Sequence, residues 1–136
     1  MKNKYMRKLC NYCKSGKILL HDDIYKVDVC IVKDKIYLVI NNKIVKKHLI
    51  NYCPICKDKL YIGGKPNKGC NNLFKYGGCV FCDEMHVLLA YYDRYYNTIY
   101  QVFIEGNKMK LHVDYNEVAS KTINRCPICR HRLKKN

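Results

Sequence analysis

The stretch INYCPICKDKL (residues 50–60) recurs as INRCPICRHRL (residues 123–133). Seven of the eleven positions are identical, and two more keep a positive charge. Each stretch follows an earlier C-x-x-C pair at a similar distance, with 39 residues between Cys13 and Cys53 and 43 between Cys82 and Cys126. A unit that repeats at a fixed period indicates a duplicated module. The 136-residue chain is therefore expected to hold two copies of one small unit.

Between its cysteine pairs, each copy has apolar residues at every second position on both sides of a polar turn. This pattern predicts a β-hairpin, with turns near residues 33–35 and 105–108. A shift of 73 residues superposes the apolar positions: Val29 on Val102, Ile31 on Ile104, Ile36 on Met109, Leu38 on Leu111 and Ile40 on Val113. We therefore expect both copies to bury the same face.

Eight of the ten cysteines form four C-x-x-C pairs. Two intervening residues suit a turn that points both sulfurs at one ion, and zinc prefers four thiolates in a tetrahedron. We expect two structural Zn²⁺ ions, one for each copy. The expected ligands are Cys10, Cys13, Cys53 and Cys56 for the first ion, and Cys79, Cys82, Cys126 and Cys129 for the second.

Three other interpretations of these cysteines stay open. A secreted, disulfide-rich protein would use many cysteines but needs an export signal. A redox dithiol would explain the CPIC motif but requires a βαβ context. The pairs could also be shared differently, with Cys10/Cys13 joining Cys79/Cys82 and the two CPIC pairs holding a second ion. The duplicated hairpin favours pairing within each copy.

Two cysteines and the histidines remain outside this scheme. Cys30 aligns with Phe103 and is expected to be a small buried apolar residue. Cys70 has no counterpart in the other copy and is expected to be a free thiol. His48 and His112 come nearest to ligand candidates, but the eight cysteines already complete both ligand sets.

The glycines mark the boundary between the copies, because five of the seven lie in residues 61–78. Glycine, proline and asparagine together predict a linker or irregular loop there. We therefore expect a small, mostly β protein of two tandem zinc-ribbon-like modules, each a β-hairpin closed by a Cys₄ zinc site. The first module spans residues 1–60, the Gly-rich linker residues 61–78 and the second module residues 79–136. The pattern leaves open whether the modules move relative to one another or pack together.

The formal net charge of +15 favours an anionic partner such as nucleic acid. Residues 1–68 carry 16 basic and 5 acidic side chains, whereas residues 69–136 carry 10 and 6, so the first module is the expected anion-binding half. Cations gather in three places: Lys2, Lys4, Arg7, Lys8, Lys14 and Lys17; Lys43, Lys46 and Lys47; Arg130, Arg132, Lys134 and Lys135. The alternative explanation of the high lysine content is an AT-rich coding sequence.

Five tyrosines and an arginine lie in residues 91–100, YYDRYYNTIY. Tyrosine and arginine are enriched among the residues that dominate binding energy at protein interfaces. Tyr92, Arg94 and Tyr96 are therefore candidate contacts to a protein partner, as Lys43, Lys46 and Lys47 are to an anion. The alternative is a strand whose tyrosines pack across the hairpin. The oligomeric state does not follow from these patterns.

Catalytic motifs are missing from the sequence. A closed Cys₄ site leaves no coordination position for water, and no H-E-x-x-H or phosphate-loop motif occurs. We therefore expect a protein that is not an enzyme. The longest apolar run has six residues, Val87 to Tyr92, so we expect no membrane-spanning segment. No signal-peptide pattern is visible, which favours the cytoplasm, where thiols stay reduced.

The element I-N-x-C-P-x-C, followed by a basic stretch and leucine, resembles the end of small zinc-ribbon-like proteins encoded by bacteriophages of AT-rich Gram-positive hosts. Such proteins combine an early C-x-x-C, a β-hairpin and a late C-P-x-C, a set that occurs twice here. The residue after their last cysteine is commonly glycine, where this chain has Lys57 and Arg130.

This resemblance implies zinc-ribbon-type folding, a viral origin and location in the host cytoplasm. It is compatible with two functions. The first is binding of nucleic acid or of a host nucleic-acid-handling complex. The alternative is inhibition of a host defence protein by direct protein contact, as anti-CRISPR proteins do.

Overall fold

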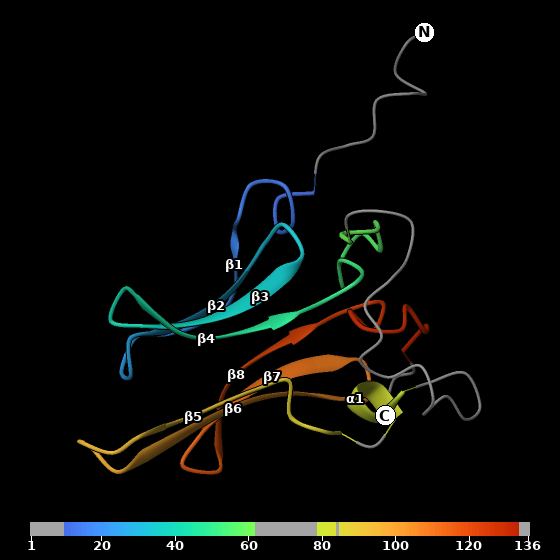
Figure 1. Ribbon diagram of the computed structural model, residues 1–136. Helices are drawn as coiled ribbons and strands as arrows, with labels where there is room; N and C mark the ends of the chain where they lie inside the picture. Colours follow the sequence, from blue (N-terminus) through green and yellow to red (C-terminus); the bar gives the residue numbers. More distant parts are fainter. Residues whose placement is uncertain (1–9, 62–78, 84, 134–136) are drawn as a thin grey trace, which may run out of the picture.

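The computed structural model describes residues 10–61, 79–83 and 85–133 (Figure 1). Two four-stranded antiparallel sheets make up this part of the chain, with strand orders β1-β2-β3-β4 and β5-β6-β7-β8. The first sheet contains β1 (Ile18–Asp22), β2 (Val27–Val32), β3 (Lys35–Ile40) and β4 (Lys43–Leu49). The second contains β5 (Leu89–Asp93), β6 (Thr98–Glu105), β7 (Lys108–Val113) and β8 (Asn116–Thr122), and a short helix α1 (Val80–Asp83) precedes it.

The two hairpins expected from the apolar alternation are confirmed as β2–β3 and β6–β7. Their registers correspond, because Val29 pairs with Leu38 in the first sheet and Val102 with Leu111 in the second. The alternating residues of these strands are buried on one side and half-buried on the other. The mostly β fold class is therefore confirmed.

Each hairpin is the middle of a four-strand meander, which corrects the expectation of a hairpin alone. The outer strands have no clean alternation that a sequence pattern could detect. Strand β4 reads KIVKKHL, and its register with β3 shifts between Leu38 and Val39. Strand β8 shifts at the corresponding place, between Leu111 and His112. A bulge of this kind moves following side chains to the opposite face and breaks the period of two.

The two sheets face one another (Figure 1). Their buried residues form one hydrophobic cluster. Leu38 and Leu111, at the centres of β3 and β7, are both completely buried within the same cluster. The outer strands of the sheets also approach each other, β1 near β8 and β4 near β5. The copies thus pack together, which answers the question that the sequence left open.

Two further expectations concern residues beyond this description. Apart from Tyr61, the linker at residues 61–78 lies outside the described residues, as does Cys70. The same holds for the terminal cations Lys2, Lys4, Arg7, Lys8, Lys134 and Lys135. In the described ranges, no helix combines the length and apolar character needed to cross a membrane.

Candidate metal centres

The eight paired cysteines form two groups, each made of an early and a late C-x-x-C pair from the same copy. The first group is Cys10, Cys13, Cys53 and Cys56, and the second is Cys79, Cys82, Cys126 and Cys129. In each group the four sulfurs lie within 4.8 Å of one another. These are the sets expected from the spacing, and the swapped arrangement of pairs is wrong.

The distances between sulfurs match those around one tetrahedral ion. Four thiolates at about 2.3 Å from a metal stand roughly 3.8 Å from each other. In the first group Cys10 Sγ lies 3.8 Å from Cys53 Sγ, and Cys13 Sγ lies 3.5 Å from Cys56 Sγ. The equivalent distances in the second group are 3.7 Å for Cys79–Cys126 and 3.6 Å for Cys82–Cys129. Both groups therefore fit a bound metal ion.

Burial makes the thiols of Cys13 and Cys53 hard to ionise without a cation. It raises the pKa of Cys53 to about 12 and also raises the pKa of Cys13. The backbone amides of Ile55 and Cys56 act in the opposite direction at Cys53, because they donate to its sulfur. Four thiolates in one buried group repel each other, so a divalent ion supplies the positive charge that they need to remain ionised.

The late pair of each group sits in the same tight turn. In the first copy the amide of Lys57 donates to the carbonyl of Cys53, and the amide of Cys53 donates to the carbonyl of Asp58, at 2.8 and 3.0 Å. Arg130, Cys126 and His131 repeat these bonds at 2.9 and 3.0 Å. The residue after the last cysteine has positive φ in both copies, 59° for Lys57 and 68° for Arg130. The turn keeps its form where the resembling proteins have glycine, at the cost of strained backbone.

We predict that Lys57→Gly stabilises the metal-loaded protein by about 1 kcal/mol, because only glycine adopts positive φ without a steric cost. Arg130→Gly serves as the comparison, since the Arg130 guanidinium lies 5.2 Å from the centre of the Tyr52 ring. Loss of that cation–π contact costs about 0.5–1 kcal/mol and offsets the gain. Urea unfolding of both variants measures the difference. Destabilisation by Lys57→Gly would contradict the strain argument.

The two late turns bind each other across the molecule. The amides of Asn51 and Tyr52 donate to the carbonyl of Pro127, at 2.7 and 2.9 Å. In return, the amides of Asn124 and Arg125 donate to the carbonyl of Pro54, at 2.9 and 3.2 Å. The two turns correspond to the green and red coils at the right of Figure 1. The late turn of each metal group is thus hydrogen-bonded to the backbone of the other late turn.

Side chains reinforce this contact in both directions. The Asn51 amide donates to the carbonyl of Ile128 at 2.7 Å, and the Asn124 amide donates to the carbonyl of Ile55 at 3.0 Å. The repeated Ile-Asn before each CPIC motif therefore has a structural role. The Ile-Asn pair directly precedes the metal-binding turn of its own copy. The side-chain hydrogen bonds of its asparagine nevertheless go to carbonyls of the opposite copy.

The aromatic residue inside each early C-x-x-C pair also reaches the other copy. Lys121 on β8 lies 4.7 Å from the centre of the Tyr12 ring and lowers the pKa of the Tyr12 hydroxyl. His48 on β4 packs edge-on against Phe81, with ring centres 5.4 Å apart. His48 and Lys121 are equivalent positions, so the two contacts mirror each other. His48 therefore supports the interface and belongs to neither metal group.

The other candidate residues lie away from the metal groups. Lys43, Lys46 and Lys47 are exposed on β4. Tyr92, Arg94 and Tyr96 are exposed on β5 and the turn that follows it, while Tyr91 packs against Tyr100 across the hairpin. His112 stacks edge-on with Phe103, and Cys30 is only half-buried on the outer face of β2. Neither His112 nor Cys30 joins a metal group within the described ranges.

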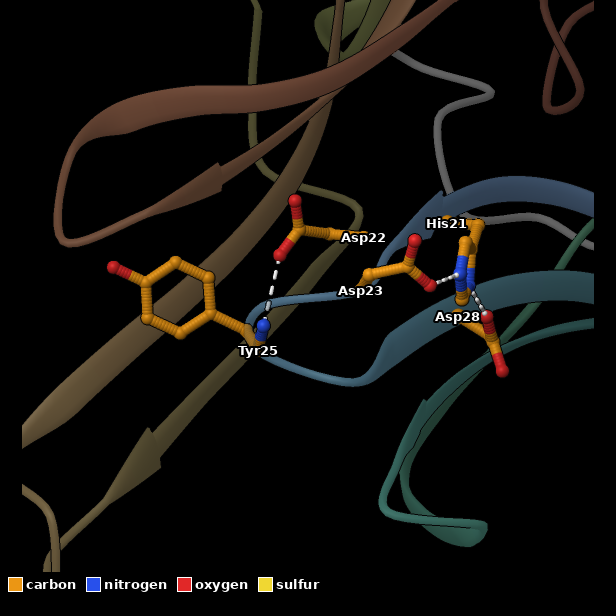
Figure 2. Close-up of polar contacts among 5 residues, drawn as sticks. All are labelled: His21, Asp22, Asp23, Tyr25 and Asp28. Carbon is orange, nitrogen blue, oxygen red and sulfur yellow. Dashed lines mark hydrogen bonds and ion pairs between the residues drawn. The ribbon is translucent and has the colours of Figure 1, made fainter.

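A polar cluster that sequence reasoning missed lies at the β1–β2 turn (Figure 2). The His21 imidazole lies between two carboxylates, with Nδ1 2.5 Å from Asp28 and Nε2 2.5 Å from Asp23. These contacts raise the pKa of His21, Asp28 having the larger effect. Because both ring nitrogens are engaged, the cluster offers no imidazole nitrogen to a metal. The Asp22 carboxylate accepts a hydrogen bond from the backbone amide of Tyr25, which closes the turn.

Comparisons with protein-family models, with curated proteins and with solved structures yielded no match for this chain. The resemblance to bacteriophage zinc-ribbon proteins therefore rests on the cysteine motifs and the hairpin pattern alone.

Proposed function

We propose that this chain is a non-enzymatic, zinc-stabilised protein that binds single-stranded nucleic acid through the lysines of β4. Four thiolates in a closed tetrahedron are the ligand set that structural zinc prefers. Such a site has no open position for a substrate, so the metal serves the fold and the surface carries the function.

The supporting observation is the difference between β4 and β8, which are the same strand in two copies of one fold. Strand β4 exposes Lys43, Lys46 and Lys47. The corresponding residues of β8 are Asn116, Ala119 and Ser120. Because β8 folds without lysine at these positions, the fold itself does not require the three cations. The second copy acts as an internal control for the first.

Two general explanations of surface lysine account poorly for this difference. Lysine on an edge strand discourages pairing with another chain, but β8 is equally an edge strand. An AT-rich coding sequence would add lysine to both copies alike. The imbalance of 16 basic to 5 acidic residues in the first half, against 10 to 6 in the second, extends beyond β4.

The architecture favours single strands over duplex DNA. The described residues contain one helix, α1, of four residues, which is too short to enter a major groove. A strand with several lysines can instead follow an extended phosphate backbone, as the basic grooves of single-strand-binding proteins do. Binding of this kind depends on charge and tolerates many sequences.

The test is a fluorescence-anisotropy titration with a labelled mixed-sequence oligonucleotide, in single-stranded DNA and RNA forms. We expect Lys43→Gln/Lys46→Gln/Lys47→Gln to weaken binding by about tenfold or more at low salt and by less at high salt. The variant neutralises fewer phosphates and so releases fewer counterions on binding, and the free energy gained from that release shrinks as the salt concentration rises. The matched control is Lys26→Gln/Lys108→Gln/Arg132→Gln, which removes the same charge from other exposed positions. Equal affinities of the β4 variant and this control would disprove the proposed surface, and absence of binding by the wild type would disprove the function.

The β5–β6 turn supports a second candidate, contact with a protein such as a host defence factor. Its tyrosines project into solvent, with Tyr92, Tyr95 and Tyr96 exposed by 51, 86 and 71%. Soluble proteins seldom leave several large rings exposed together without a binding role. An aromatic interface changes little with salt, whereas phosphate binding weakens steeply. Partner capture that survives high salt and is lost on replacing Tyr92, Arg94 and Tyr96 with alanine would favour this candidate.

A further inference from the structure

A hollow of about 560 Å³ lies beside the first metal group. Three segments surround it: the early cysteine turn with Lys14 and Gly16, the β2–β3 turn with Val32 and Lys33, and the end of the late turn with Lys59 and Leu60. Its size falls within the range of roughly 300–1,000 Å³ that is common for small-molecule sites. Gly16 has no atom within 4 Å of where a side chain would begin, so this side of the hollow is open.

The lining combines an apolar wall with a rim of cations. Val32, which is 45% exposed, and the half-buried Leu60 both line the hollow and leave apolar surface in contact with solvent. Lys14, Lys33 and Lys59 are exposed, and none of them has an ion-pair partner among the described residues. Among the described residues that line the hollow, none is acidic. Three unpaired ammonium groups around an apolar wall suit a ligand with one flat apolar part and one anionic part.

The second copy lacks this combination in its sequence. The positions equivalent to Lys14, Val32 and Lys33 are Asp83, Glu105 and Gly106. Glu105 is paired with Lys110, whose Nζ lies 2.8 Å from Oε1. Only Lys59 has a basic equivalent, Arg132. The turn therefore folds without lysine at this point, and the cations of the first copy are additions to a shared framework.

We propose that the hollow binds one nucleotide unit, with the phosphate between Lys14, Lys33 and Lys59 and the base against Val32 and Leu60. A phosphate alone would use the cations but not the apolar wall. The unit can come from a bound single strand or from a free nucleotide, and the two sources share this chemistry. The first source rests on the proposed function, whereas the second does not.

The experiment is NMR of the zinc-loaded full chain with labelled methyl groups. The probes are adenosine monophosphate, inorganic phosphate and a single-stranded oligonucleotide. We expect the nucleotide and the oligonucleotide to shift the methyl signals of Val32 and Leu60, and phosphate to leave them in place. Lys14→Gln/Lys33→Gly should weaken nucleotide binding by about tenfold, through loss of two of the three charges.

This variant should fold, because Lys33 has a φ of 58° and glycine occupies the equivalent position with a φ of 62° at Gly106. The matched control is Lys26→Gly/Lys108→Gln, since Lys26 is also exposed with positive φ, 53°. It should bind like the wild type.

Each outcome separates the two proposals. If neither the oligonucleotide nor the mononucleotide moves these methyl signals while the oligonucleotide still binds, the hollow is not a nucleotide site and the proposed function stands. If the mononucleotide moves them and the oligonucleotide does not bind, the hollow takes free nucleotide and the proposed function is wrong. If phosphate competes as well as the nucleotide, or if the variant and the control bind alike, the nucleotide site is disproved.

Discussion

Replacing Cys53 with serine will reduce the metal content from two ions per chain to less than one and will unfold both sheets in a single transition. Cys53 is completely buried, and its sulfur is one of the four that make up the first metal group. Structural zinc contributes on the order of 10 kcal/mol of apparent binding free energy per site. That is as large as the whole free energy of unfolding of most small folds, which is about 5–15 kcal/mol.

The effect should reach the second metal group for two structural reasons. The turn that contains Cys53 also holds Pro54, whose carbonyl accepts the amides of Asn124 and Arg125 just before Cys126. The two sheets also share one hydrophobic cluster, so neither can unfold without exposing the apolar face of the other. The loss of one site therefore removes support from its partner.

Elemental analysis of the purified protein and calorimetric unfolding measure both quantities, and the wild type should contain two zinc ions per chain. Cys30→Ser is the control, because Cys30 belongs to neither metal group and should leave both ions bound. A Cys53→Ser protein that keeps one full equivalent of metal and unfolds in two separate steps would show that the copies are independent.

Asn51→Ala will lower the free energy of unfolding by about 1–3 kcal/mol, the cost of leaving a buried polar group without its partner. The Asn51 side chain is 2% exposed and donates to the carbonyl of Ile128, across the contact between the copies. After the change, water cannot easily reach that carbonyl.

The equivalent substitution, Asn124→Ala, provides the matched comparison. Asn124 makes the same bond to Ile55, but it is exposed, so water can replace its amide. We expect less than about 1 kcal/mol there. Urea unfolding of the two zinc-loaded variants compares them directly. Equal destabilisation would mean that burial does not govern the strength of these bonds.

The sequence was sufficient to predict the central hairpins and the two metal groups. The central strands are paired on both sides, and their buried residues alternate strictly with less buried ones, so the pattern is visible in the sequence. These buried residues include Val29, Leu38, Val102 and Leu111. The cysteine grouping was predictable because two residues between ligands fix a local turn. Both inferences depend on contacts that are short in sequence or repeated in the second copy.

The outer strands and the contact between the copies could not be predicted in the same way. The bulge in β4 disrupts the alternation that marks a strand, and the lysines of β4 resemble a loop in composition. The repeated asparagine was visible at residues 51 and 124, but its partners lie 77 and 69 residues away. The hollow beside Lys14 and Lys33 likewise forms only when three distant segments meet.

The reciprocal bonds between Asn51 and Pro127 and between Asn124 and Pro54 have the form of an isologous interface, in which two subunits present the same patch to each other. This chain is in effect a homodimer joined into one polypeptide. Its subunits cannot be diluted apart, because the tether keeps their local concentration high at any protein concentration. In a homodimer every substitution appears in both subunits, whereas in a single chain with two copies each copy can change separately. One half could therefore carry the lysines of β4 and of the hollow, while the other half has different residues at those positions and still supports the shared core.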